Sequence, residues 1–341
     1  MPIDHEKQRS RQTELDILRF IAIVGVLIIH SSTRFASSDI EKHIGAWFSI
    51  FSRPCVGIFL FISGFLLSKN YFDCYQLIRH FKRVLIPYTF FSILAFLYKY
   101  NIEIASIIYK HPFNIFFQYV FGNSFGIYYF VFIICINYIL LFYSNNSTYD
   151  VILIFFSIVI LVHTAYYKEI VSLLSHSFKF NDDVYINRYI FWPFFFFLGA
   201  KTQSAHLVKY LKDKKLYFIY FWIVSFLIYN VLFYFDFNNI DGYNSIIGTI
   251  YTIATIYFLF CMDIKSNSII MYIGKMSYYL YLSHIFIVYI FCDGAKFYRI
   301  SLPFWFSIVS FLMSLFIPLL FYEFQKKLFN NQFSKYLGVM D

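Results

Sequence analysis

The amino-acid sequence predicts an all-α fold, a bundle of about ten transmembrane helices, and three observations lead to this prediction. Of the 341 residues, 60% are hydrophobic and only 14% are charged, whereas a soluble domain has roughly 25% charged residues. The apolar residues fall into runs near the roughly 20 residues that cross a bilayer as a helix. Each run is apolar on nearly every side, unlike the alternating strands of a membrane barrel.

The expected spans follow one another along the chain with short polar connections. We place them at 14–32, 46–68, 84–98, 127–143, 151–166, 188–201, 215–235, 246–263, 276–293 and 303–323. The longest connections, 99–126 and 167–187, are too short to bury a core of their own. We therefore expect one transmembrane domain over 1–341, with a polar N-terminal segment at 1–13 and a C-terminal tail at 324–341.

The distribution of Lys and Arg predicts the orientation of the helices. With ten spans and a cytoplasmic N-terminus, 17 of these residues fall on the inner side and 9 on the outer side, while Arg19 and Arg53 lie within spans. Cytoplasmic connections carry the excess of Lys and Arg in membrane proteins. Without the weakest span, 188–201, the tally reverses. We therefore keep ten spans and place both termini in the cytoplasm.

Composition also bears on partners and sites. Lys and Arg outnumber Asp and Glu by 28 to 19, but they lie at helix ends rather than in one patch, so we expect a lipid bilayer and no nucleic acid as partner. The five cysteines form no CxxC pair, so we predict neither a disulfide nor a metal site.

The first apolar run, preceded by Lys7, Arg9 and Arg11, also has the form of a cleaved signal peptide, which is an open alternative.

Two polar residues share one face of the first expected helix. Arg19 and His30 are eleven residues apart, which is about 20° past three full turns and about 16 Å along the axis. Ionisable residues within a membrane are costly and usually face a bundle interior or a wet cavity, so both are functional candidates. The structural alternatives are an ion pair of Arg19 with Asp16 and a hydrogen bond from His30 to a neighbouring helix.

Further candidates lie in later spans. Arg53 enters the second span at the outer level of His30, although it could merely anchor at the lipid head groups. The small residues Ser63 and Gly64 let helices approach closely. His284 lies in the middle of a span, where a hydrogen bond across helices explains it equally well.

A basic segment precedes the third span. Arg79, Lys82 and Arg83 could bind the phosphates of a cosubstrate, but a basic cytoplasmic loop is also what the orientation alone supplies. The sequence has no Walker-type glycine loop, no GxSxG elbow and no His/Glu zinc pattern. Function is therefore expected within the bundle or at its two mouths.

Five blocks of the sequence occur in the order found in a known family. They are Leu15 to His30 with its Arg and His, Arg53-Pro54 to Leu67 ending in Ser-Gly-Phe-Leu-Leu, Arg83 to Tyr88, Phe194 to Gly199, and Ile273 to His284. Together they resemble the acyltransferase 3 family, membrane proteins that transfer acyl groups, usually acetyl, to surface polysaccharides and other acceptors. Two positions depart from the family pattern, because Tyr128-Tyr129 replaces a frequent Trp and Lys69 a frequent Arg. These departures bear on substrate choice more than on the fold.

The resemblance implies that the first helix is retained and that acyl-CoA, by default acetyl-CoA, is a cytoplasmic cosubstrate rather than a permanently bound cofactor. It further implies a bacterial inner membrane location, with O-antigen, capsule or another surface polysaccharide or lipid-linked glycan as acceptor. In this hypothesis the CoA phosphates bind Arg19 and the basic residues Arg79, Lys82 and Arg83.

The same hypothesis gives three residues catalytic roles. His30, with an ordinary pKa of about 6.5, suits proton abstraction from a sugar hydroxyl, or it accepts the acyl group before passing it on. Arg53 stabilises the oxyanion on the thioester carbonyl, and His284 supports the reaction. The rival hypotheses are a transporter or flippase of lipid-linked glycans, disfavoured by the few glycines and prolines, and a glycan polymerase, disfavoured by the short outer loops.

Overall fold

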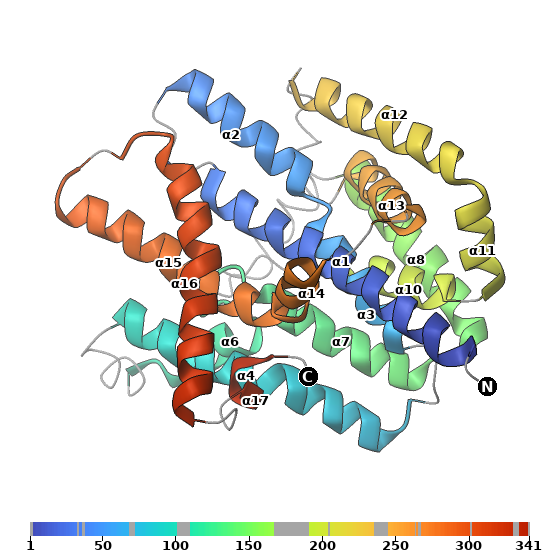
Figure 1. Ribbon diagram of the computed structural model, residues 1–341, viewed down its shortest axis with the longest axis horizontal. Helices are drawn as coiled ribbons and strands as arrows, with labels where there is room; N and C mark the ends of the chain where they lie inside the picture. The colour runs from blue at the N-terminus through green and yellow to red at the C-terminus, as the bar shows by residue number, and fades with distance from the viewer. Residues whose placement is uncertain are drawn as a thin grey trace. The chain divides into compact units, whose positions relative to one another are not determined.

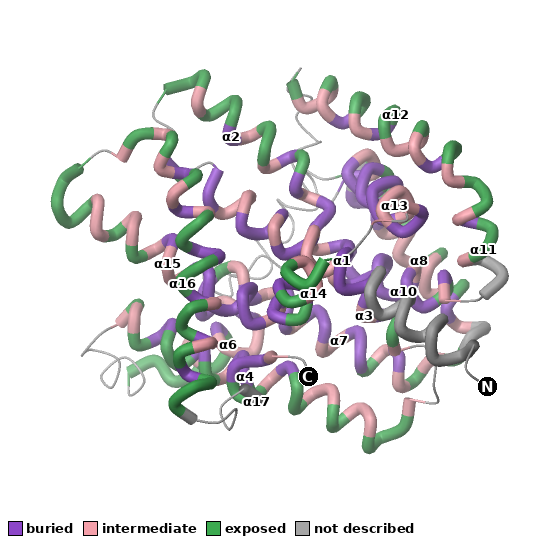
Figure 2. The backbone as a smooth tube through the Cα atoms, viewed as in Figure 1, coloured by how far each residue is buried: buried purple, intermediate pink, exposed green. Residues whose placement is uncertain are grey.

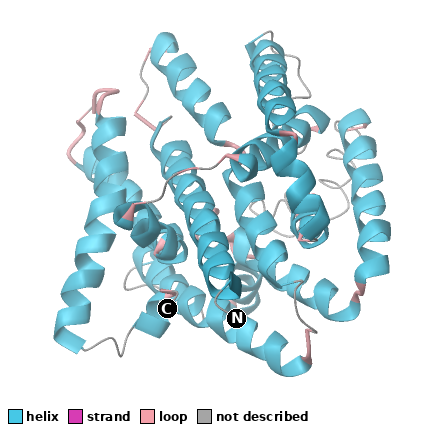
Figure 3. Cartoon of the chain, turned by 45° about the vertical axis from the view of Figure 1, so that its right-hand side comes forward, coloured by secondary structure: helices cyan, strands magenta, loops and turns pink. Residues whose placement is uncertain are grey.

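The computed structural model describes residues 3–32, 34–35, 38–67, 72–100, 110–166, 191–203, 205–234, 245–262, 264, 267–300, 302–329 and 334–339. In this part of the chain every regular element is a helix and no strand occurs (Figure 3). Side chains before Leu15 are outside the description. The all-α prediction is confirmed.

The chain divides into two compact units, one of Met1–Phe59 with Asp263–Asp341 and the other of Leu60–Met262. The first unit is built from both ends of the chain, blue α1 and α2 and orange to red α14 to α17 in Figure 1. Its helices are α1 (Ile3–Ser32), α2 (Asp39–Ser52), the start of α3 (Cys55–Leu67), α14 (Ser268–Lys275), α15 (Ser277–Phe297), α16 (Phe306–Phe329) and α17 (Ser334–Leu337). The second unit holds the rest of α3, α4 (Cys74–Tyr100), α6 (Pro112–Val120), α7 (Tyr129–Tyr143), α8 (Asn146–Ala165), α10 (Pro193–Thr202), α11 (Ala205–Asp213), α12 (Lys215–Tyr234) and α13 (Ile246–Cys261). That 1–341 acts as one domain stays a prediction.

The helices long and apolar enough to cross a membrane are six among the described residues. They are Leu15–Ser32, Asp39–Leu67, Cys74–Tyr100, Lys215–Tyr234, Ser277–Phe297 and Phe306–Leu328, and three shorter apolar helices are Tyr129–Tyr143, Thr148–His163 and Ile246–Cys261. The remaining expected span, 188–201, falls on α10, whose ten residues extend over only about 15 Å; residues 188–190 lie outside the description. The chain is therefore a multi-pass helical membrane protein, while ten spans and cytoplasmic termini stay predictions.

The second expected span begins earlier than predicted and is broken. Ser38 caps α2, because its Oγ accepts the amide of Glu41 at 3.2 Å and the Glu41 carboxylate accepts the Ser38 amide at 2.9 Å. This capping box starts a helix seven residues before the expected 46–68. Pro54, which has no amide hydrogen, separates α2 from α3. Arg53 therefore lies at the C-terminal cap of α2, in the break between two helices.

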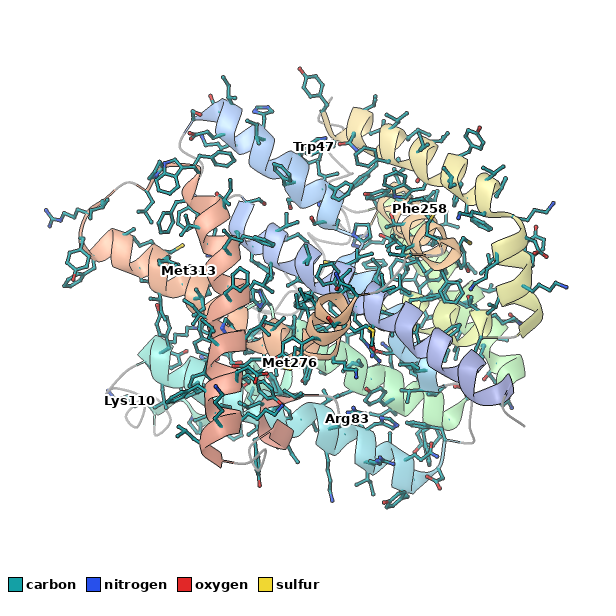
Figure 4. All side chains as sticks on the ribbon, viewed as in Figure 1. Trp47, Arg83, Lys110, Phe258, Met276 and Met313 are labelled. Atoms are coloured by element: carbon teal, nitrogen blue, oxygen red, sulfur yellow. The ribbon has the colours of Figure 1, made fainter. Side chains whose placement is uncertain are left out.

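The basic segment before the third span is helical rather than a loop. The Asp73 carboxylate accepts the Gln76 amide at 2.7 Å and starts α4 at Cys74. Residues three and four apart share a face of a helix, so Arg79, Lys82 and Arg83 form one exposed basic face. Figure 4 labels Arg83 on this helix. Lys69 lies outside the described residues.

Helix α10 is the centre of the second unit. Phe195, Phe196 and Phe197 are at most 1% exposed, and α13, purple along most of its length in Figure 2, is also buried. A Cβ at Gly64 would lie 1.8 Å from the carbonyl oxygen of Phe196, and one at Gly199 would lie 2.0 Å from that of Phe61. The close helix approach predicted at Gly64 is thus present between α3 and α10.

Candidate functional site

Arg19 is held at one end of the apolar part of α1 by an ion pair. Its Nη1 lies 2.5 Å from Oδ1 of Asp16, and the side chains are 16% and 8% exposed. The i, i+3 spacing predicted this partner. The neighbouring helix α14 packs directly on this turn, because a Cβ at Gly274 would lie 2.2 Å from the Asp16 carbonyl oxygen. Helix α14, which carries Gly274 of the Ile273 to His284 block, thus packs on the turn that carries Arg19.

His30 and His284 come together in the first unit. His30 lies in the last turn of α1 and His284 in α15, and their ring centroids are 5.4 Å apart. His30 is partly exposed, whereas His284 is 0% exposed. The packing of α15 on α1 thus brings together two imidazoles from positions about 250 residues apart in the sequence.

The hydrogen bond of His284 fixes which of its nitrogens carries the proton. Nδ1 lies 3.0 Å from the carbonyl oxygen of Leu280, and a carbonyl oxygen can only accept, so Nδ1 is the donor. In the neutral ring Nε2 is then the nitrogen with the free lone pair. Among the described residues Nε2 has no hydrogen-bond partner. The pair therefore offers an acceptor nitrogen in a buried site.

A cation that was not predicted from the sequence lies beside the two histidines. Arg34 is exposed, one helical turn beyond His30, and its guanidinium carbon lies 4.8 Å from the ring centroid of Tyr289 on α15. Phe35 anchors the turn, since its ring is 5.4 Å from that of Phe306 on α16. Arg34 follows His30 by one helical turn, but α1 ends between them, so helical spacing could not link the two residues.

The other predicted site residues are distributed over both units. Arg53 belongs to the first unit with Arg19, His30 and His284, and it is half-buried at the end of α2. The basic face of α4 belongs to the second unit. The structure brings His30 and His284 together; a joint role of Arg19 with the α4 face stays a prediction.

The comparisons with known proteins agree with the resemblance of the five blocks. The model of the acyltransferase 3 family, described as an acyltransferase domain, matches residues 12–323, nearly the whole chain. No curated protein and no solved structure matches the chain. The family match includes Arg19 and His30 of α1 and all of α15 with His284. The chain therefore belongs to the acyltransferase 3 family, and its apolar helices make it a membrane acyltransferase.

Proposed function

We propose that the chain is an O-acyltransferase that moves an acyl group, by default acetyl, from cytoplasmic acyl-CoA to a hydroxyl of a cell-surface polysaccharide such as O-antigen or capsule. The observation that carries this proposal is the imidazole pair of His30 and His284, 5.4 Å apart. Proton transfer from a hydroxyl is what a positioned histidine does best near neutral pH. The family match favours this reaction over transport of an unmodified glycan.

The proposed proton and acyl transfers balance between the two substrates and His30. The acceptor hydroxyl gives its proton to His30 while its oxygen bonds to the thioester carbonyl carbon. The tetrahedral intermediate then breaks its carbon–sulfur bond, and the CoA thiolate takes the proton back from the imidazolium. His284 lies beside His30, and Arg34 and Arg53 are the cations we propose to stabilise the oxyanion.

The donor side of this proposal rests on Arg19 and the basic face of α4. CoA carries several phosphates, which guanidinium groups bind with charge-assisted hydrogen bonds. In the proposed topology of ten spans with cytoplasmic termini, in a bacterial inner membrane, these residues lie on the cytoplasmic side. His30, about 16 Å further along α1, is then nearer the outer side, where a surface glycan arrives.

Labelling in inverted membrane vesicles tests the proposed reaction. With acetyl-CoA labelled in the acetyl group, the glycan is expected to gain label only when the protein is present. With the label in the CoA moiety, the glycan is expected to stay unlabelled, because the carbon–sulfur bond breaks. Movement of unmodified glycan without gain of label would instead identify a transporter and defeat the proposal.

Replacement of Arg19 tests the donor site. Arg19→Gln alone strands the buried Asp16 carboxylate, which destabilises the fold, so the informative variant is Asp16→Asn with Arg19→Gln. We expect this double variant to fold and to raise KM for acetyl-CoA about tenfold, since one charge-assisted hydrogen bond to phosphate is worth about 1.5 kcal/mol. Steady-state kinetics measures this change, with exposed Lys42→Gln as control. An unchanged KM would remove Arg19 from the donor site.

A further inference from the structure

Helix α6, in the second unit, turns its polar side inward and its aromatic side outward. Phe113 and Phe116 are 77% and 59% exposed, whereas Gln118, on the opposite side of the helix, is buried. Nε2 of Gln118 donates to Oδ1 of Asn114 at 3.2 Å, and the Tyr100 hydroxyl of α4 donates to Oε1 of Gln118 at 3.3 Å. A helix on the surface of a soluble protein has the reverse arrangement. The outward side of α6 is therefore suited to lipid.

Polar contacts bind the end of α6 and the turn after it to α4. Tyr88 donates its hydroxyl to the carbonyl oxygen of Tyr119, and Oγ1 of Thr89 lies 2.6 Å from the Tyr119 hydroxyl oxygen. In the turn, Ser124 donates to Oγ of Ser92 at 3.1 Å. Because both serine side chains are short, this contact places the turn directly beside α4 at Ser92.

Ser92 lies in the middle of the apolar part of α4. This part has no charged residue between Arg83 and Lys99, and Ser92 is nine residues after the first and seven before the second. These separations are about 14 and 10 Å along the helix axis. Since α4 is long and apolar enough to cross a membrane, the turn after α6 is level with the middle of a hydrocarbon core about 30 Å thick.

The turn between α6 and α7 is a specific helix break. Gly122 has a φ of 71°, the left-handed conformation in which many helices end. The amide of Asn123 donates to the Gln118 carbonyl oxygen at 2.7 Å, and the amide of Gly122 donates to that of Tyr119 at 3.1 Å. A Cβ at Gly122 would lie 2.3 Å from the carbonyl oxygen of Tyr128. Glycine at this position thus lets the chain pass closely by the start of α7.

Helix α7 continues from the turn, antiparallel to α4 (Figure 1). The ring of Tyr128 lies 5.9 Å from that of Tyr88, and the ring of Tyr138 lies 5.7 Å from that of His80. A rise of ten residues along α7 thus matches a fall of eight along α4. The 9 residues of α6 and the 15 of α7 measure about 36 Å together, which is enough to cross the hydrocarbon core.

We propose that α6 and α7 cross the bilayer as one broken helix, with Phe113 and Phe116 against lipid acyl chains and the turn at 121–128 in the middle of the membrane. Irregular backbone occurs at that depth where the protein buries it and bonds its polar groups, and Gly122 and Ser124 are buried. Lys110, exposed at the start of α6 and labelled in Figure 4, is then near the lipid head groups. This arrangement does not depend on the proposed acyl transfer.

Tryptophan fluorescence in vesicles of brominated lipids tests the contact of α6 with lipid. The full chain carries Phe113→Trp or Phe116→Trp, and the emission that the variant adds to that of the four native tryptophans is measured. We expect bromine near the ends of the acyl chains to quench Phe116→Trp most. Phe113→Trp should be quenched most by bromine nearer the head groups, and iodide in the water should quench neither.

Tyr75→Trp is the control for these variants, because Tyr75 is 73% exposed on the polar start of α4; iodide rather than bromine should quench it. Quenching of Phe116→Trp by iodide alone would place α6 in water, and equal depths for the two α6 positions would place it flat along the membrane surface. Absence of both kinds of quenching would mean that protein, such as a second copy of the chain, covers α6. Each of these three results would overturn the proposal.

Tyr88→Phe tests the depth of the turn. In the middle of a membrane no water replaces the lost hydrogen bond to the Tyr119 carbonyl oxygen, so we expect Tm in lipid vesicles to fall by several degrees. The matched variant Tyr272→Phe loses a hydrogen bond of 2.5 Å to the exposed Glu323 carboxylate, which water replaces, and Tm should hardly change. Equal Tm values for the two variants would contradict the proposed depth. Neither experiment measures acyl transfer, so failure of the proposed function would leave both results valid.

Discussion

The variant His30→Ala is expected to lose acyl transfer by roughly 10²–10⁴-fold, the usual contribution of a general base, while the protein still folds and inserts. The side chain is only partly buried, and its contact in the structure is with the His284 ring. Among the described residues its removal therefore strands no buried hydrogen-bond partner. NMR of the host polysaccharide measures the outcome as disappearance of the O-acetyl signals.

A second histidine on the same unit provides the control for this variant. His43 is exposed on α2, where its Nδ1 bonds the Asp39 carbonyl oxygen at 2.6 Å. His43→Ala should leave acetylation intact, which separates loss of the base from loss of any histidine. Full acetylation with His30→Ala in the membrane would remove His30 from the reaction. A direct role as acyl carrier would instead appear as an acyl-histidine trapped during turnover.

Local rules account for the parts of the structure that were predicted correctly. Long runs of apolar residues indicate segments that lie in lipid, and backbone groups in lipid must hydrogen-bond within their own segment. The helical fold therefore follows from the length and apolar character of the runs. The Arg19–Asp16 pair follows from helical spacing, because both residues lie on one continuous helix. The close contact at Gly64 follows because a residue without a side chain at a helix face leaves room for a neighbour.

The predicted helix boundaries were wrong where a helix-capping residue or a proline, rather than hydropathy, sets the end of a helix. A hydropathy run merges α2 and α3, whereas the capping box at Ser38 and the missing amide hydrogen of Pro54 set the true boundaries. Arg53, expected inside one continuous span, is therefore at the C-terminal cap of α2. Asp73 likewise begins α4 ten residues before the expected span at 84, so the basic residues became a helical face.

The site itself depends on register between distant helices, which no local pattern encodes. His30 and His284 meet only because α15 packs along α1, and Arg34 contacts the same helix at Tyr289.

Gly64→Ala is expected to destabilise the second unit by at least about 3 kcal/mol, at the upper end of the usual cost of overpacking. The new methyl group would lie 1.8 Å from the carbonyl oxygen of Phe196, and a backbone atom cannot turn aside as a flexible side chain can. Helices α3 and α10 would have to separate. The fully buried Phe196 and Phe197 would then lose contacts on both sides.

Gly126→Ala is the matched control, because the same methyl group there meets nothing within 4 Å. Thermal unfolding in detergent should show a lower Tm for Gly64→Ala and little change for Gly126→Ala. Gly199→Ala should behave like Gly64→Ala, since its methyl group would meet the Phe61 carbonyl oxygen at 2.0 Å. Because the two glycines form one contact, the double variant should cost less than the sum of the two single variants. Additive losses would mean that the two helices do not approach each other at this point.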